Sequence, residues 1–237
     1  MKYEIRRAGT ISYTRQIYND LLSGLKDKKM VFPEIFQDYE KYHEVVNTGR
    51  LFRAKLIEDW IDRDSSILDV GIGDGVVAEY FSKKLNSTVS GLDISEIACR
   101  KAKEKGIDSR VRDINYGLHL QNDEIYDYLL LMEVIEHTVQ PEKVVKDAIK
   151  HAKKGVIVTI PNSGYFRWRI HLLRGYTPRQ SYTHLHFWSI KDFEIWCALL
   201  GISIKSFKTI LPPFLKPLKN LFAWQQCWLL NSDANRP

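Results

Sequence analysis

Hydrophobic residues recur along this chain with two alternating periods, and that pattern predicts strands that alternate with helices. Short apolar runs are typical of buried strands, whereas apolar positions three or four residues apart are typical of helices that cover a sheet. The expected strands are 67–70, 88–94, 110–114, 126–137, 156–160, 202–210 and 222–230, and the expected helices are 11–25, 39–61, 76–85, 96–105, 141–153 and 190–200. This order predicts an α/β fold with a doubly wound sheet. For the tail at 222–230, a helix on a membrane surface is the alternative.

The turn that follows the first expected strand is rich in glycine. Gly71, Gly73 and Gly75 follow Asp69 at alternate positions, whereas a dinucleotide fingerprint would need glycine at position 76, which is valine. Glycines in such a turn let a ligand approach the backbone where the next helix begins. Asp69 and Asp74 would repel a pyrophosphate at close range, so the turn favours a ligand with positive charge.

The segment 68–75 resembles the first motif of class I S-adenosylmethionine-dependent methyltransferases, whose cofactor carries an ammonium and a sulfonium group. A glycine turn in another doubly wound protein is the alternative. The resemblance implies a Rossmann-like sheet of seven mostly parallel strands with helices on both faces, and S-adenosylmethionine as the cofactor. It also implies an N-terminal helical cap over residues 1–62 and a methyltransferase domain over residues 63–237.

Acidic residues at the ends of the expected strands are the candidates for holding this cofactor. Asp93 follows Asp69 by 24 residues, a spacing at which a strand-end carboxylate meets ribose hydroxyls, although a helix cap is the alternative. By resemblance, Asp113 would bind the adenine amino group, unless it belongs to a simple turn. The segment 132–137 resembles the branch of small-molecule methyltransferases that includes ubiquinone O-methyltransferases, which implies that Met132 and Glu133 lie near the transferable methyl. The expected cofactor-binding residues are Asp69, Gly71, Gly73, Gly75, Asp93, Ile94, Asp113, Ile114, Met132 and Glu133.

A segment rich in arginine and aromatic residues follows the fifth expected strand. Together with residues 183–193 it resembles the MetW family, whose proteins are associated with methionine biosynthesis, and the likeness covers roughly residues 64–231. We expect a substrate-binding insertion at about 162–188. The expected substrate-binding residues are Tyr39, Tyr42, Asn162, Arg167, Arg169 and Arg179. Aromatic packing onto the sheet and solvated arginines are the alternatives for the individual side chains.

Three histidines are candidate bases, because a hydroxyl or amine acceptor must lose a proton during methyl transfer: His137, His184 and His186. An acceptor that is already anionic would instead need cations, which the arginines supply. The leading hypothesis is therefore methyl transfer to an oxygen, or a nitrogen, of a small anionic metabolite, such as a phosphorylated or sugar-linked precursor. The second is a MetW-like regulatory partner of an acyltransferase in methionine biosynthesis. The third, a nucleic-acid methyltransferase, lacks its proline-rich motif after the fourth strand.

Composition limits the remaining possibilities. The chain of 237 residues has room for one α/β domain and a small cap. Its net charge of +6 favours an anionic substrate or surface, although a charge of this size more often serves solubility than nucleic-acid binding. Three scattered cysteines contain no Cys-x-x-Cys pair, and His184 and His186 have no third ligand nearby in the sequence, so we expect no metal site. We find no apolar run of transmembrane length and no signal peptide, which predicts a cytoplasmic protein. The oligomeric state stays open.

Overall fold

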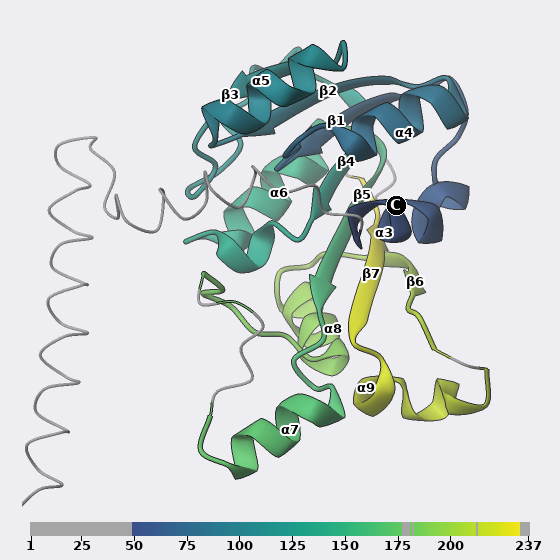
Figure 1. The fold of residues 1–237 in the computed structure, drawn as a ribbon, viewed down its shortest axis with the longest axis vertical. Helices are drawn as coiled ribbons and strands as arrows, with labels where there is room; N and C mark the ends of the chain where they lie inside the picture. Colours follow the sequence, from purple (N-terminus) through teal and green to yellow (C-terminus); the bar gives the residue numbers. More distant parts are fainter. Residues whose placement is uncertain (1–48, 177–180, 182, 212, 233–237) are drawn as a thin grey trace, which may run out of the picture. The chain divides into compact units, whose positions relative to one another are not determined.

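Seven strands form one sheet in the computed structural model, which describes residues 49–176, 181, 183–211 and 213–232 (Figure 1). Their order is β3-β2-β1-β4-β5-β7-β6, and all strands run parallel except β7, which is antiparallel to both of its neighbours. The strands are β1 (Ser66–Val70), β2 (Thr88–Asp93), β3 (Asp108–Val111), β4 (Tyr126–Met132), β5 (Ala152–Pro161), β6 (Ile204–Lys208) and β7 (Gln225–Leu230). The predicted α/β fold with seven mostly parallel strands is confirmed.

Helices cover both faces of this sheet. They are α3 (Gly49–Ile57), η1 (Glu58–Trp60), α4 (Val76–Leu85), α5 (Glu96–Glu104), η2 (Ile135–His137), α6 (Pro141–His151), α7 (Phe166–Leu173), α8 (Ile190–Leu199), η3 (Pro213–Leu218) and α9 (Lys219–Phe222). Along β4, Leu129 and Leu131 pack with α6 and α8, whereas Tyr128 and Leu130 pack with α3 and α4. Because successive strand side chains point to opposite faces, both faces of this central strand are buried.

Several element boundaries differ from the prediction, and two of these differences lie next to the central strands. The fourth strand ends at Met132 instead of residue 137, because Glu133 adopts a left-handed backbone with φ of 59°. The helix expected to reach residue 153 ends at His151, and Gly155 lies within β5 instead of ending the helix. A Cβ at Gly155 would lie 2.9 Å from the carbonyl oxygen of Leu230, so glycine allows β7 to approach β5.

The leading helices fall partly outside the described residues. The first expected helix, 11–25, and the start of the second lie outside them, so the predicted cap over 1–62 stays a prediction. The described part, α3, buries Ala54 and Ile57 in the same cluster as Phe81 of α4. The boundary predicted at residue 62 therefore falls after a helix that shares the core of the sheet.

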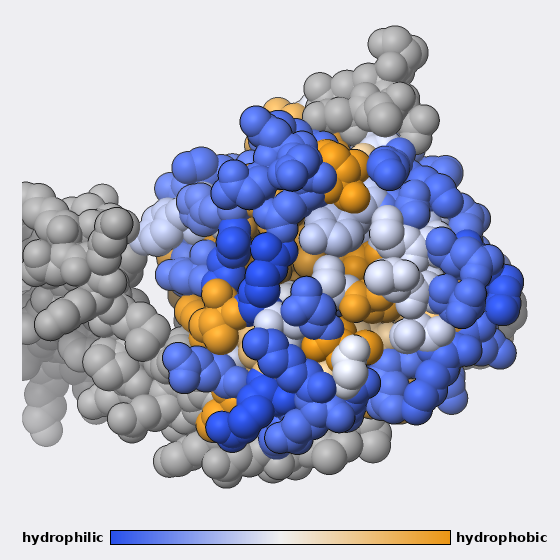
Figure 2. Space-filling model, turned by 90° about the horizontal axis from the view of Figure 1, so that it is seen from above, coloured by the Kyte–Doolittle hydropathy of each residue, from blue (hydrophilic) through white to orange (hydrophobic). Residues whose placement is uncertain are grey.

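The end of the molecule that Figure 2 shows has a mainly polar surface among the described residues. Figure 2 shows one end of the molecule, where hydrophilic residues predominate and hydrophobic residues form small separate groups. Among the described residues, no helix is both long and apolar enough to cross a bilayer.

Candidate functional site

The predicted cofactor turn lies between β1 and α4. Gly71, Gly73 and Gly75 have φ angles of 76°, 58° and 75°, a left-handed conformation that side chains with a Cβ rarely adopt. The amide of Gly71 donates to the carbonyl oxygen of Leu92 at 2.7 Å, which joins the turn to the neighbouring strand β2. A Cβ at Gly75 would lie 2.9 Å from the Cα of Ala102, so the turn also packs closely on α5.

Asp93 is the residue that holds this turn in place. Its side chain is buried at the end of β2, where one carboxylate oxygen accepts from the amide of Gly73 at 2.8 Å and the other accepts from the amide of Ser95 at 2.9 Å. The hydroxyl of Ser95 accepts from the amide of Ala98 and caps α5. Ser95 therefore occupies the cap position, and the helix-cap alternative for Asp93 is not needed. Ile94 follows Asp93 and is half-buried.

Asp69 is buried at the end of β1, beside Asp93. Burial in a site with little water raises the pKa of Asp69 to about 7, and the negative charges of Asp93 and Asp74 add to this effect while Arg50 opposes it. The parallel pairing of β1 with β2 explains why two carboxylates from separate motifs lie close together. A bound cation would lower the free energy of the ionised form of Asp69.

The sequence predicts that the carboxylate of Asp74 acts on a ligand, whereas in the structure this carboxylate is paired with two cationic side chains. A guanidinium nitrogen of Arg50 lies 3.4 Å from one carboxylate oxygen of Asp74, and the ammonium of Lys105 lies 3.9 Å from the other. A Cβ at Gly73 would clash with the Arg50 guanidinium, which shows how closely this group covers the turn. The turn therefore carries a cation as well as carboxylates, an arrangement that suits a ligand with both charges.

The residues expected to bind adenine lie after β3. Asp113 is exposed, and its carboxylate accepts from the backbone amide and side-chain amide of Asn115 at 2.9 and 2.8 Å. The strand itself ends at Val111, so Asp113 belongs to a turn, as the alternative stated. Ile114 is half-buried and packs against the core. A contact of either residue with adenine stays a prediction.

Met132 is the last residue of β4, and Glu133 follows it directly. Met132 packs against the core cluster that contains α3 and α4. The side chain of Glu133 is half-buried, and its carboxylate accepts from the side-chain amide of Gln225 at 2.5 Å and from the hydroxyl of Thr159 at 3.4 Å. Burial raises the pKa of Glu133, while the charge of Arg53 and these two hydrogen bonds lower it. The Glu133 side chain thus joins β4 to β5 and β7.

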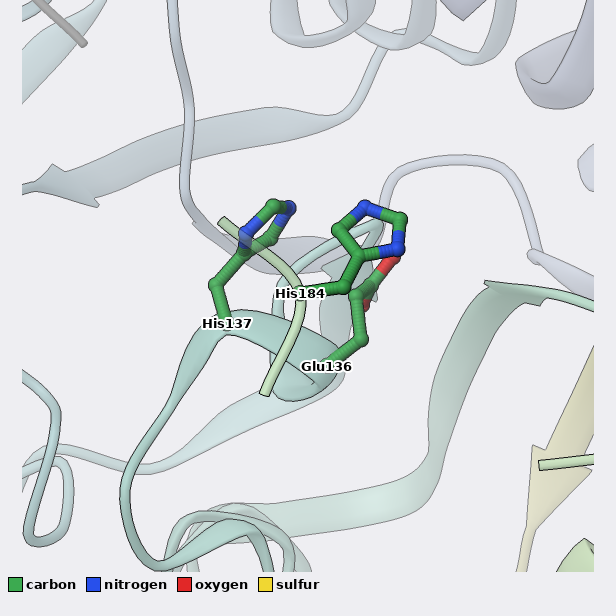
Figure 3. Close-up of side chains that lie close together, drawn as sticks. All are labelled: Glu136, His137 and His184. Carbon is green, nitrogen blue, oxygen red and sulfur yellow. The ribbon is translucent and has the colours of Figure 1, made fainter. Parts of the chain in front are cut away.

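A group of three polar side chains gathers just beyond Glu133. Glu136 and His137 come from η2, and His184 comes from the segment that precedes α8; Figure 3 shows the three side chains side by side. The side-chain ligand atoms of these residues all lie within 4.8 Å of one another. The rings of His137 and His184 meet edge to face at a centroid distance of 4.6 Å. The structure therefore brings two of the three predicted histidines together with an acid that the prediction had not included.

Backbone contacts fix this group in position. The amides of Leu185 and His186 donate to the carbonyl oxygen of Glu136 at 2.8 and 3.2 Å. The Nδ1 of His137 lies 3.2 Å from the carbonyl oxygen of Thr183, which can only accept, so Nδ1 carries the hydrogen. Burial lowers the pKa of His137 to about 4, so this ring is neutral near pH 7 and is a weak base.

His186 occupies a different environment from the other two histidines. Its Nε2 lies 2.9 Å from the carbonyl oxygen of Thr138, and its ring stacks on Trp188 at a centroid distance of 5.4 Å. Both His184 and His186 border a pocket that opens to solvent, with about 270 Å³ of empty space when the open solvent in its mouth is included. The pocket is lined by Glu136, Ile160, Pro161, Ser163, Trp168, His184, His186, Phe187 and Trp188.

The predicted substrate residues are spread over different environments. Asn162 is fully buried, and its amide group donates to the carbonyl oxygens of Ala223 and Asn220 while its oxygen accepts from the amide of Gly164. Its side chain therefore holds the pocket wall to α9. Arg167 and Arg169 are exposed on α7, outside the pocket lining, and Arg169 donates to the carbonyl oxygen of Gly164. Tyr39, Tyr42 and Arg179 lie outside the described residues.

Sequence reasoning missed Glu136 as a site residue. The available signal was its position three residues after Glu133, in a short turn that places both carboxylates at one edge of the sheet. The pKa of Glu136 is raised well above its usual range by burial, and the charge of Glu133 adds to this effect. The expectation of no metal site considered only neighbours in sequence, whereas the structure supplies Glu136 and His137 from a distant segment.

Comparisons with known proteins give this arrangement a family context. The family model described as "Methionine biosynthesis protein MetW" matches residues 52–212. The ubiquinone biosynthesis O-methyltransferase of Hydrogenovibrio crunogenus is 26% identical over 155 residues, which cover 60% of this chain and 64% of that protein. The norajmaline N-methyltransferase of Rauvolfia serpentina is 28% identical over 113 residues, which cover 45% and 39% respectively. The chain thus spans only part of the length of these curated relatives.

Solved structures share the fold at low sequence identity. A magnesium protoporphyrin IX methyltransferase from Synechocystis PCC 6803, determined with bound SAH, has a TM-score of 0.59 and 15% identity, and the match covers 85% of this chain and 96% of that one. A possible histamine N-methyltransferase from Thermotoga maritima has a TM-score of 0.57 and 18% identity, with 85% and 97% covered. These likenesses show the fold of S-adenosylmethionine-dependent methyltransferases.

Proposed function

Because this chain belongs to the MetW family and has the fold of S-adenosylmethionine-dependent methyltransferases, we propose that it transfers a methyl group from S-adenosylmethionine to an oxygen of a small anionic acceptor. The observation that carries the proposal is the pair of buried carboxylates, Asp69 and Asp93, beside a turn of left-handed glycines. Asp93 suits the ribose hydroxyls, since a carboxylate accepts hydrogen bonds from both. The ammonium of the cofactor suits Asp69.

The charge of Arg50 supports the same cofactor. S-adenosylmethionine is a zwitterion at its methionine end, with a carboxylate beside the ammonium. A guanidinium that lies over Gly73 suits this carboxylate, and the nearby Asp69 suits the ammonium. The donor is already activated, so the main task of the protein is to hold the acceptor in line with the methyl group.

The pocket next to the ends of β4 and β5 is the proposed acceptor site. Trp168 and Phe187 supply apolar walls, while His184 and His186 supply polar groups. Arg167 and Arg169 lie on α7, the helix that also contributes Trp168, and they favour the approach of an anion. The O-methyltransferase relative favours oxygen over nitrogen as the acceptor atom.

Methyl transfer can be tested directly with the purified chain. We expect S-adenosylhomocysteine to form when S-adenosylmethionine is supplied with a panel of small hydroxylated acids and sugar phosphates, and mass spectrometry would identify the product. Methylation of neutral acceptors alone would refute the anionic class. Binding of the cofactor without any transfer, together with co-purification of an acyltransferase, would favour a regulatory MetW-like protein instead.

The double substitution Arg167→Ala and Arg169→Ala should raise the KM for an anionic acceptor by about 10-fold, because two surface cations that attract it are removed. The kcat should change little. Steady-state kinetics at low and high salt would measure this, since screening should reduce the difference. Arg100→Ala, an exposed arginine on α5, is the matched control. An equal rise in KM in the control would contradict a local role for α7.

Asp69→Asn should stabilise the ligand-free protein and weaken cofactor binding. The pKa of Asp69 is about 7 in the folded chain, above its usual 3.8, so its contribution to stability is complete below pH 4 and is lost as the pH rises to 7. The substitution should therefore raise the free energy of unfolding by about 4 kcal/mol at pH 8 and by less than about 1 kcal/mol at pH 4.

Urea unfolding at several pH values would measure the stability change, and calorimetry with S-adenosylhomocysteine would measure the binding change. In the native protein, affinity for this ligand should rise between pH 6 and 8, as Asp69 loses its proton. Asp123→Asn, at an exposed acid, is the control and should change neither quantity. A stability gain of the same size at every pH would rule out titration of Asp69 as the cause.

A further inference from the structure

A buried carboxylate without hydrogen bonds is the starting observation. Glu136 is only 1% exposed, and among the described residues neither of its carboxylate oxygens has a hydrogen-bond partner. An unpaired carboxylate in such an environment is costly, and burial in proteins normally requires a paired charge or a bound cation. Its ligand atoms lie within 4.8 Å of those of His137 and His184.

The orientation of His137 suits a cation. Its Nδ1 donates to the carbonyl oxygen of Thr183, and in this tautomer Nε2 carries the lone pair with which an imidazole ligates a metal. A hydrogen bond from the second ring nitrogen to a backbone carbonyl is the usual arrangement for histidines that bind metals, because it sets both the tautomer and the ring orientation. The same backbone segment carries His184, so one contact positions two of the three groups.

We propose that Glu136, His137 and His184 form a binding site for one divalent transition-metal ion, with zinc as the best fit, whose remaining coordination positions face the acceptor pocket. Two imidazoles and one carboxylate favour transition metals over Mg²⁺ or Ca²⁺, which prefer sets made of oxygen alone. Ligand atoms around one Zn²⁺ lie roughly 3 to 4 Å apart, so small side-chain rotations close the present arrangement.

The position of the site indicates what else it would bind. Glu136 and His184 both line the pocket that also contains Trp168, so a metal held here would face the pocket. Three protein ligands leave a zinc ion with at least one open position, as in catalytic zinc sites. A small molecule with a negatively charged oxygen would fill the open coordination position of the zinc ion. Glu133, whose charge affects Glu136, lies close enough to stabilise the bound cation.

Calorimetry on the chelator-treated chain of 237 residues would test this site with ZnCl₂ and MgCl₂ as probes. We expect one Zn²⁺ per chain, with much weaker binding of Mg²⁺. Glu136→Gln and His184→Ala should each lower the affinity for Zn²⁺ by at least about 100-fold, because each removes a direct ligand. His171→Ala, at an exposed histidine on α7, is the matched control and should bind as the native protein does.

Two further measurements distinguish loss of the metal ligands from a failure to fold and from a change at the cofactor site. If a variant fails to fold, the visible absorption of the native protein loaded with Co²⁺ still reports whether nitrogen and oxygen ligands hold the metal. Affinity for S-adenosylhomocysteine should be the same in all folded variants, which separates this site from the cofactor site. Equal Zn²⁺ binding by the native protein and both ligand variants, or no stoichiometric binding at all, would overturn the proposal.

Discussion

Asp93→Ala should lower the affinity for S-adenosylhomocysteine by about 100- to 1,000-fold, or roughly 3 to 4 kcal/mol. The substitution removes the proposed acceptor of the ribose hydroxyls. It also removes the hydrogen bonds that Asp93 accepts from the amide of Gly73, in the glycine turn, and from the amide of Ser95, at the start of α5. Those amides are buried and would lose their partner, which adds to the cost. Isothermal titration calorimetry at constant pH would measure the change.

Two comparisons separate the causes of this loss. Asp93→Asn keeps one acceptor oxygen and should fall between the native protein and the alanine variant. Asp108→Ala removes an exposed acid at the opposite end of β3 and should leave the affinity unchanged. If Asp93→Ala bound the ligand as tightly as the native protein, the cofactor would have to lie elsewhere, and the proposed function would lose its main support.

Trp228→Ala should lower the free energy of unfolding by about 3 to 5 kcal/mol, because it leaves a large cavity at the centre of the C-terminal half of the sheet. Trp228 lies on β7 and is 1% exposed. Its ring stacks on Phe193 of α8 at 5.2 Å and meets Phe207 of β6 at 4.4 Å, while its Nε1 donates to the side chain of Gln226. Denaturation in urea would measure the change.

Trp224→Ala is the matched control for this experiment. Trp224 precedes β7 and is 38% exposed, so we expect it to cost less than about 1 kcal/mol. Trp228→Ala should also weaken acceptor binding in the pocket. Trp228 donates to the side chain of Gln226, which in turn donates to the carbonyl oxygens of Pro161 and Trp188 in the pocket wall. Equal destabilisation by both substitutions would show that β7 does not depend on this aromatic cluster.

Local patterns in the sequence were sufficient for the elements around the cofactor turn. The predicted helix over 76–85 agrees with α4, Ser95 caps α5, and Ser189 caps α8 through a capping box with Asp192. Such signals act over a few residues, so they can be read without knowing the fold. Asp69 and Asp93 also followed from sequence, because the carboxyl ends of adjacent parallel strands lie at one edge of a sheet.

The roles of individual charged residues and glycines could not be predicted as well from the sequence, because these roles depend on residues that are distant in the chain and close in space. Asp74 was expected to act on a ligand, but Arg50 and Lys105 pair with it. Gly155 comes two residues after the helix that the sequence predicts over 141–153, but it lies in β5 where the main chain of β7 comes close. A glycine signals only that a Cβ is absent, and the reason for its absence is decided by what packs against it.

The sequence by itself determined the α/β order, the helix caps, the glycine turn and the two acids that end β1 and β2, because each depends on periodicity or spacing within a short segment. Only the tertiary structure decided that β7 inserts between β5 and β6, that Asn162 holds α9, and that Glu136 meets His184. These contacts join segments that are distant in the chain. Their formation depends on the packing free energy of the whole sheet, which no local pattern of residues contains.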